Sequence, residues 1–276
     1  MTDTRAPLLF RYPGGKHYAM DILRPFWTSV VHDEYREPFA GGATVFFNKA
    51  KSDYNWLNDL DSELVTTYKV VADPKQRSKL LTRVATEVAN KKRWREVYEM
   101  TPKSELEIAF KYFYLNRTSF SGKLVSAAWG YRPKRSLPPD RWHERINPCG
   151  AKVSDVKITN WDFERVIEAP SKRAVLMYVD PPYILPPKKK HYRHGLNHDD
   201  HLRLANSLKR TKHKFFLTYD DAEEIHNLYS WAYIYPKKFF YRVDNSAVQN
   251  GVRRHGFELV ISNYRITGFE QLNLNL

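Results

Sequence analysis

Short apolar runs alternate along the chain with longer stretches of helical periodicity. The clearest run is residues 174–179, Ala-Val-Leu-Met-Tyr-Val, which predicts a strand buried on both faces of a sheet. Comparable signals predict strands near Tyr35 and at residues 54–58, 214–218 and 257–263, and the sheet pattern also resumes at residues 157–163, where Asp162 caps a strand just before a helix. Helical patterns cover residues 17–31, 62 to about 116 (with breaks at Pro74 and Pro102), 199–209 and 221–229. This alternation predicts an α/β protein with a mostly parallel sheet.

The strongest predicted strand ends on Asp180-Pro181-Pro182-Tyr183. Two prolines cannot continue a central strand, so the chain leaves the sheet at its carboxyl edge, where open α/β sheets bind ligands. The proline carbonyls only accept hydrogen bonds. This corner suits a planar ring that stacks on Tyr183 while its amine donates to Asp180 and to the Pro181 carbonyl. An ordinary strand end with turn chemistry fits these four residues equally well.

Two glycine turns are candidates for a cofactor site. Pro13-Gly14-Gly15-Lys16 permits a tight turn that brings backbone N–H groups close to a ligand, although a plain turn with a solvated lysine also fits. The second turn, Glu37-Pro38-Phe39-Ala40-Gly41-Gly42, lies between a predicted strand and an apolar helix. It lacks both the Gly-x-Gly-x-x-Gly pattern of dinucleotide enzymes and the ending of a P-loop.

An acid follows the second predicted strand, about twenty residues beyond Glu37 in the order expected of nucleotide-type folds. This Asn58-Asp59 pair places a carboxylate where it can hold the two hydroxyls of a ribose. Together with the glycine turn, it favours a cofactor site over a purely structural turn.

The charge of the chain narrows the choice of partner. The 276 residues carry 45 Lys and Arg against 31 Asp and Glu, a formal charge of +14, which predicts a polyanion such as nucleic acid. A membrane surface is the weaker alternative, because no basic amphipathic helix stands out. The single cysteine, Cys149, excludes a disulfide framework or a cysteine zinc site within the chain. With no signal peptide or membrane-spanning run, we expect a cytoplasmic, metal-free protein.

Basic residues gather in two segments. Residues 121–150 are rich in Gly, Pro and Ser, with Trp129, Tyr131 and Trp142 among arginines and lysines, and a long irregular segment of this kind suits contact with phosphates and base edges. A basic loop at residues 186–194 follows the Asp180 corner. The residues predicted to bind DNA are Arg117, Ser119, Lys123, Arg132, Lys134, Arg135, Lys188, Lys189, Lys190 and Arg193.

Taken together, these motifs resemble the DNA adenine methylase family of S-adenosylmethionine-dependent methyltransferases over nearly the whole chain. The matching segments are Tyr12-Pro13-Gly14-Gly15-Lys16, Glu37–Gly42, Asn58-Asp59, Phe113–Gly122, Asp180-Pro181-Pro182-Tyr183 and Glu258–Tyr264. Each match is weak alone, but their order and spacing are specific. The resemblance implies a Rossmann-like, mostly parallel seven-stranded sheet with a helical and hairpin target-recognition insert. The implied divisions are a catalytic domain at residues 1–70 and 152–276, with the insert at 71–151.

The resemblance also implies S-adenosylmethionine as cofactor and a set of site residues. The catalytic residues would be Asp180, Pro181, Pro182 and Tyr183. The cofactor site would contain Tyr12, Gly14, Gly15, Lys16, Glu37, Pro38, Phe39, Gly41, Asp59, Asp162, Phe163 and Asp180, with Asp162 and Phe163 near its adenine. The implied partner is double-stranded DNA, from which the target adenine flips out of the stack. We expect a monomer or weak dimer. Whether a cognate restriction enzyme accompanies the protein is left open at this point.

Three alternatives remain at this point. The same corner can methylate the exocyclic amine of cytosine, although Asp rather than Ser at its first position favours adenine. Charge alone does not separate DNA from RNA, and an inactive DNA-binding protein is the alternative of another class, against which the intact Asp180 and Lys16 argue. The segment Lys123–Pro139 differs from the hairpin of family members that methylate Gly-Ala-Thr-Cys, so the target sequence is left open.

Overall fold

A seven-stranded sheet forms the centre of the computed structural model, which describes residues 7–12, 15–184, 193–240 and 255–266. The strands lie in the order β3-β2-β1-β4-β5-β7-β6. Their bounds are β1 Glu34–Glu37, β2 Tyr54–Asn58, β3 Lys157–Thr159, β4 Val175–Val179, β5 Lys214–Asp220, β6 Tyr233–Phe240 and β7 His255–Ser262. The first five strands pair in parallel, and β7 is antiparallel to both β5 and β6. The prediction of a mostly parallel α/β sheet is confirmed.

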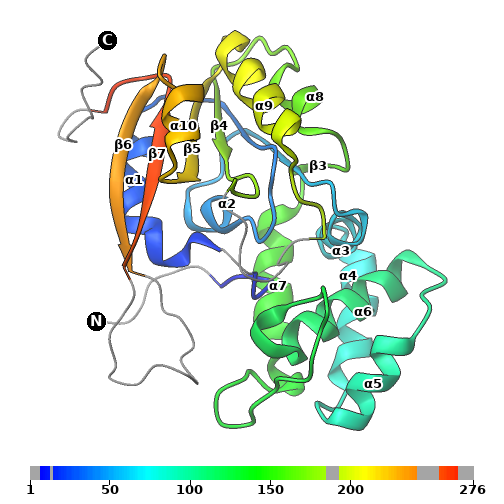
Figure 1. Ribbon diagram of the computed structural model, residues 1–276. Coiled ribbons are helices and arrows are strands. Elements are labelled where there is room, and N and C mark those ends of the chain that lie inside the picture. The colour runs from blue at the N-terminus through cyan, green and yellow to red at the C-terminus, as the bar shows by residue number, and fades with distance from the viewer. Residues whose placement is uncertain (1–6, 13–14, 185–192, 241–254, 267–276) are drawn as a thin grey trace.

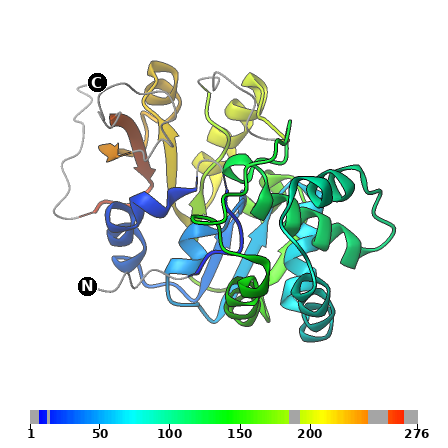
Figure 2. The same cartoon turned by 90° about the horizontal axis from the view of Figure 1, so that it is seen from below.

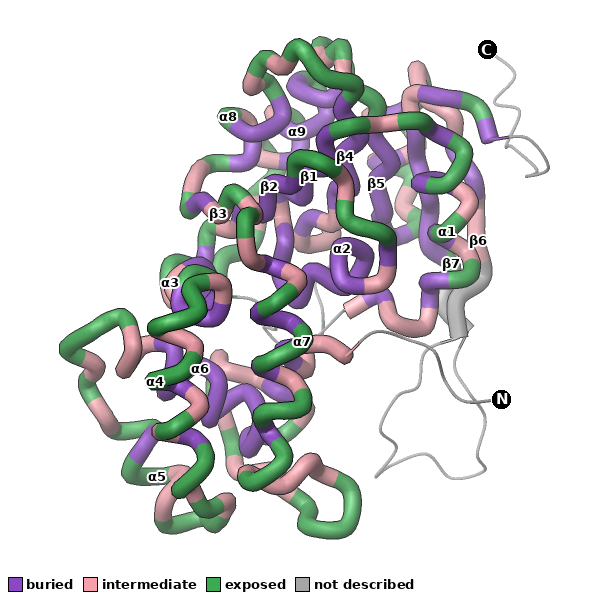
Figure 3. The backbone as a smooth tube through the Cα atoms, turned by 180° about the vertical axis from the view of Figure 1, so that it is seen from behind, coloured by how far each residue is buried: buried purple, intermediate pink, exposed green. Residues whose placement is uncertain are grey.

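Both faces of the sheet are covered by helices, as the apolar run of β4 predicts. Val175, Met177 and Val179 pack into one buried cluster with α8 (Phe163–Ile167), α9 (His198–Arg210) and α10 (Glu223–Leu228). Leu176 and Tyr178 point to the opposite face and join a larger cluster that includes α1 (Met20–Thr28) and α2 (Thr44–Asn48). Figure 1 shows α9 and α1 on opposite sides of the strands, and Figure 3 shows the strands between them as buried.

A second group of helices lies beside the sheet and matches the region predicted to be an insert (Figures 1 and 2). It contains α3 (Ser62–Ala72), α4 (Pro74–Ala85), α5 (Lys91–Glu99), α6 (Glu105–Thr118) and α7 (His143–Val153). Pro74 is the first residue of α4, where its missing N–H costs nothing, and Asp73 caps that helix by accepting from Gln76 N at 2.8 Å. The predicted boundaries at 70 and 151 fall inside α3 and α7, and the division into domains stays a prediction.

The segment predicted to be irregular, residues 121–150, is partly helical. A single antiparallel bridge joins Ser119 to Trp129, and the 3-10 turn Pro139–Arg141 then leads into α7. The prediction was wrong for residues 143–150, because Pro148 and Gly150 disguise a helix that packs on α3 and α4. The prediction that Trp142 lies in an irregular DNA-binding segment was also wrong, because its ring is fully buried. The ring packs edge-on against Phe113 and Tyr114, with centroid distances of 5.5 and 5.6 Å.

One asparagine connects this helical group to the N-terminal segment. Asn116, near the end of α6, accepts from Arg11 N at 2.8 Å and donates to Arg11 O at 2.9 Å. Its amide also donates to Gly122 O at 3.0 Å. These three hydrogen bonds form the Asn116 clasp, which fixes the backbone immediately before Tyr12. Within the described part of the chain, no helix has the length and apolar character needed to cross a membrane.

Candidate active site

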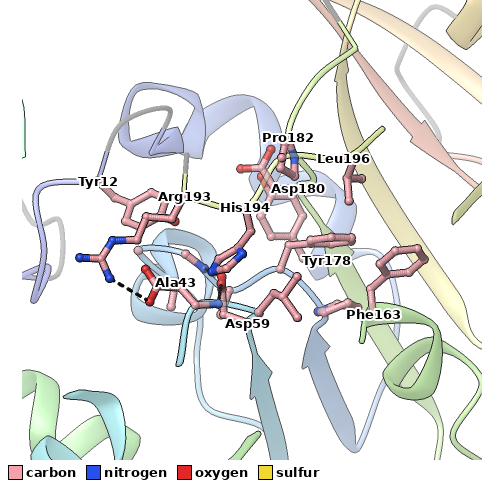
Figure 4. Close-up of a pocket in the computed structure, with 18 of the residues that line it drawn as sticks. Tyr12, Ala43, Asp59, Phe163, Tyr178, Asp180, Pro182, Arg193, His194 and Leu196 are labelled. Carbon is pink, nitrogen blue, oxygen red and sulfur yellow. Dashed lines mark hydrogen bonds and ion pairs between the residues drawn. The ribbon is translucent and has the colours of Figure 1, made fainter. Parts of the chain in front are cut away.

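A cavity of about 140 Å³ lies at the carboxyl ends of β1 and β4. Connections from β1 run outward through β2 to β3, while those from β4 run the other way to β5. These two strands therefore flank the topological switch point, where α/β sheets bind ligands. Figure 4 shows side chains from several distant segments facing this cavity. The predicted residues that line it are Tyr12, Gly15, Lys16, Pro38, Phe39, Gly41, Asp59, Asp162, Phe163, Asp180 and Pro182.

The glycine turn after β1 lies directly against the Tyr12 ring. Gly41 has a φ of +46°, and a Cβ there would lie 2.8 Å from Tyr12 Cε1, so both the backbone and the close approach require glycine. Tyr68 Oη donates to Gly41 O at 2.8 Å, and Gly41 N donates to Asp59 Oδ2 at 2.8 Å. The loop is thereby held from both sides, with Tyr12 covering it.

Asn58, at the end of β2, uses its whole buried amide to position this loop. Its Nδ2 donates to the carbonyls of Pro38 and Trp161, both at 2.9 Å. Its Oδ1 accepts from Thr159 Oγ1 at 2.7 Å and from Trp161 N at 2.9 Å. The ends of β1, β2 and β3 are therefore joined through one side chain, a positioning role that the sequence analysis missed.

Asp59 faces the cavity with both oxygens already accepting a backbone N–H. Oδ2 bonds to Gly41 N and Oδ1 to Asp61 N at 2.9 Å. Burial raises the pKa of Asp59 to about 6, against the opposing effect of these two hydrogen bonds, and the nearby Asp61 carboxylate adds to the rise. A carboxylate can accept about four hydrogen bonds, so lone pairs remain for two hydroxyl groups of a ligand.

The far wall of the cavity is aromatic. Phe39, in the glycine turn, stacks on Phe163 with a centroid distance of 5.2 Å and an interplanar angle of 28°. Asp162 caps α8 by accepting from Glu164 N at 2.9 Å and is paired with Arg203 at 2.9 Å. An apolar slot edged by polar groups suits a purine ring.

Asp180 occupies the opposite end of the cavity, directly after β4. Lys16 Nζ, only 4% exposed, lies 2.8 Å from its Oδ1 and 3.1 Å from its Oδ2. Thr218 Oγ1, from β5, donates to the same Oδ1 at 2.6 Å, and Tyr178 Oη lies 3.1 Å from that hydroxyl. Three elements therefore fix the orientation of the carboxylate. The accepting capacity of Oδ2 is less used than that of Oδ1.

Tyr183, next to this corner, is held by a buried carboxylate from β7. Its Oη donates to Glu258 Oε2 at 2.9 Å, and Tyr18 Oη donates to Glu258 Oε1 at 3.1 Å. Glu258 is 2% exposed, and Lys16 Nζ lies 4.9 Å from the centre of the Tyr183 ring. This ring is consequently fixed before any ligand stacks on it.

Three predicted site residues have other roles in the structure. Glu37 does not line the cavity but lies fully buried behind it, where its Oε1 accepts from Tyr35 Oη at 2.7 Å and from Phe46 N at 2.8 Å. Burial raises the pKa of Glu37 to about 8. Arg193 lines this cavity and is paired with Asp61 and Glu63 at the α3 N-terminus, and its contact with DNA stays a prediction. Ser119 is fully buried and accepts from Trp94 Nε1 at 3.0 Å, so it has no free face for DNA.

The other predicted DNA contacts divide into two groups. Arg132, Lys134 and Arg135 are exposed and line a second cavity, together with the buried Arg117. Lys123 is half-buried near the bridge at Ser119. Of the remaining site residues, Pro181 is buried behind Asp180, while Gly14, Lys188, Lys189 and Lys190 lie outside the described residues.

With this cavity at the switch point of the sheet and the corner that begins at Asp180 on its rim, the molecule has the fold of a Rossmann-like methyltransferase. The model of the D12 class N6 adenine-specific DNA methyltransferase family matches residues 12–243, and the chain belongs to that family. It is therefore a site-specific DNA methyltransferase that acts on adenine. The family supports adenine in DNA over the cytosine and RNA alternatives.

One curated relative illustrates how far the similarity extends. The Type II methyltransferase M.CviBI of Paramecium bursaria Chlorella virus NC1A is 26% identical over 265 residues. The match covers 93% of this chain and 99% of the relative, so the two proteins correspond along almost their full length.

Proposed function

We propose that the chain binds S-adenosylmethionine in the cavity at the switch point and methylates N6 of an adenine flipped out of duplex DNA. The observation that carries this proposal is the placement of the Asp180 corner on the rim of the same cavity as Asp59 and Phe163. A donor held along that cavity has its ribose and adenine at one end and its reactive group near the acceptors at the other.

The residues present fit such a cofactor. Asp59 offers lone pairs for the ribose hydroxyls, and the Phe163 wall offers an apolar face for the adenine. Gly41 and Gly42 allow the Tyr12 side chain to pack directly on the loop, since a Cβ at either glycine would lie 2.8 Å from that side chain. When bound, the cofactor supplies an electrophilic methyl group on a positively charged sulfur.

The catalytic corner acts on the amine of the target base. The lone pair of an exocyclic adenine nitrogen is delocalised into the ring, so that nitrogen is a poor nucleophile. If its two N–H groups donate to Asp180 and to the Pro181 carbonyl, the nitrogen becomes pyramidal and its lone pair becomes available for attack. Because Lys16 and Thr218 already fix the Asp180 carboxylate, these acceptors need no reorganisation during the reaction. Asp180 is also the nearest acceptor for the proton that the amine loses.

The target base must leave the duplex to reach this corner. Tyr183 provides the face on which it stacks, and Glu258 holds that ring in place from behind. The name of the viral relative supports a further proposal, that the chain modifies a restriction site in partnership with a cognate restriction enzyme. We propose that it does so as a monomer or weak dimer, on DNA within the cytoplasm.

The test is transfer of a radiolabelled methyl group to duplex DNA, followed by identification of the modified base. We expect N6-methyladenine from the wild-type protein and a loss of at least about 100-fold with Asp180→Asn, the scale of removing one oriented electrostatic partner. The amide keeps the shape of the side chain, and its oxygen in the Oδ1 position still accepts from Thr218 and Lys16. Asp53→Asn, at an exposed turn, is the matched control. Modified cytosine, or an active Asp180→Asn variant, would contradict the proposal.

A further inference from the structure

A second cavity, of about 1070 Å³, lies between the N-terminal segment and the chain that follows α6. Tyr12, Gly15 and Thr44 line both this cavity and the cofactor cavity, so the two are neighbours across the glycine turn. Its lining contains several arginines and no aspartate or glutamate among the described residues. The cavity therefore has the charge expected of a site for an anion.

Two of these arginines have a buried Nε atom without a hydrogen-bond partner, although only Arg117 is buried as a whole and Arg145 is half-buried. Arg117 is only 8% exposed, and its Nε is buried with no hydrogen-bond partner. The Nε of Arg145, on α7, is buried without a partner as well. Within the described part of the chain, neither side chain has an ion pair, whereas other arginines such as Arg93 and Arg203 are paired with acids. A buried charge without a partner is costly, which is the situation of a site built for a ligand.

The electrostatics of the pair agree with this geometry. Burial lowers the pKa of Arg117 to about 10, and repulsion from Arg11 and Arg145 contributes in the same direction. Three positive groups are thus held near one another. The Asn116 clasp fixes the backbone on both sides, since it bonds to Arg11 and immediately precedes Arg117. The site is pre-organised, so an anion would not have to order it.

We propose that Arg117 and Arg145 form a pocket for a backbone phosphate of the DNA close to the flipped nucleotide. The proposal rests on the proposed function and adds to it the part of the substrate that these residues hold. A guanidinium presents several N–H donors in a planar fork that matches phosphate oxygens, and both buried Nε groups would gain an acceptor. Contacts of this kind set the position of the duplex and carry no sequence information.

This assignment separates two kinds of arginine in the same cavity. Arg132 and Arg135 are exposed at its outer edge, where side chains are free to adapt to base edges. Arg117 is buried and Arg145 half-buried, so both are less exposed than the outer pair. We expect the deep pair to supply affinity for all DNA and the outer pair to supply discrimination among sequences.

The experiment measures duplex binding by fluorescence anisotropy across a salt titration for Arg117→Gln and Arg145→Gln. Arg141→Gln is the matched control, because Arg141 lines the same cavity but is exposed and paired with Glu144. The probes are two unrelated duplexes and one that carries the target site mapped by sequencing of methylated DNA. Cofactor affinity by calorimetry and the thermal midpoint are measured on the same samples.

Each deep variant should bind all three duplexes more weakly by a similar factor, and the slope of log K against log salt should fall by about one. Arg117→Lys should keep the slope, because it keeps the charge. Thermal midpoints of the glutamine variants should be unchanged or raised, since an uncompensated buried charge is removed. Cofactor affinity should not change.

Three results would overturn the inference alone: an unchanged slope, a loss confined to the target duplex, or a loss of cofactor affinity. The second would make Arg117 a base reader, and the third would mean that the anion is the cofactor's carboxylate. If the wild-type protein binds none of the duplexes, the proposed function itself fails.

Discussion

Lowering the pH from about 7 to about 5 should weaken the binding of S-adenosylmethionine roughly tenfold, or about 1.4 kcal/mol. The pKa of Asp59 is raised to about 6 in the free protein by burial. Ribose hydroxyls donate to the ionised carboxylate, so the bound state favours the charged form and lowers this pKa. Above pH 6 the ionised form of Asp59 already dominates, so the affinity for S-adenosylmethionine does not change with pH. Below pH 6 a proton must be released on binding, and affinity falls by up to about tenfold per pH unit.

The assay is isothermal titration calorimetry at several pH values in buffers of matched ionic strength. Asp59→Asn should bind more weakly at pH 7 and lose the pH dependence. Among the described residues, Asp61 and His194 affect the pKa of Asp59, so His194→Gln is needed to separate protonation of that ring. An affinity that stays level down to pH 5, or a dependence that survives in Asp59→Asn, would refute the role of this carboxylate.

Two further predictions concern residues that position the site. Asn58→Ala should lower the free energy of unfolding by about 3 kcal/mol, because several buried partners lose a hydrogen bond. The control Asn160→Ala removes one exposed hydrogen bond and should change the free energy of unfolding little. Equal urea midpoints for the two variants would contradict this prediction. Tyr183→Phe keeps the stacking ring and should retain most activity, whereas Tyr183→Ala should lose about 1–3 kcal/mol of base stacking, visible in kcat/KM on duplex DNA. Equal impairment of both tyrosine variants would show that the bond to Glu258, and not the ring face, is what matters.

Part of the sheet was predictable from local patterns, most clearly β4, which is an apolar run that ends in a polar turn. The second strand was predicted with its observed bounds, and the last three predicted elements differ from the observed ones only at their ends. The strand β6 was missed because Pro236 interrupts it. That proline is tolerated since β6 pairs only with β7 and lies at the edge of the sheet. Similarly, α7 was hidden by Pro148 and Gly150.

The site was predicted where its chemistry is encoded beside a strand end, as for Asp59 and Asp180. It was mispredicted where a partner distant in the sequence decides the role. Glu37 is turned inward by Tyr35 and Phe46. Ser119 and Trp142 look like surface chemistry in a basic segment, yet the packing of α5, α6 and α7 buries them. Asn58 and Glu258 act through contacts that no spacing reveals.

The Asn116 clasp joins two segments of backbone that border both cavities. On one side it leads to Tyr12, which covers the glycine turn of the cofactor cavity, and on the other to Arg117 in the basic cavity. A ligand in either cavity would therefore lie beside the same hydrogen-bonded stretch of backbone. By thermodynamic reciprocity, the factor by which the methyl donor changes the affinity for DNA equals the factor by which DNA changes the affinity for the donor.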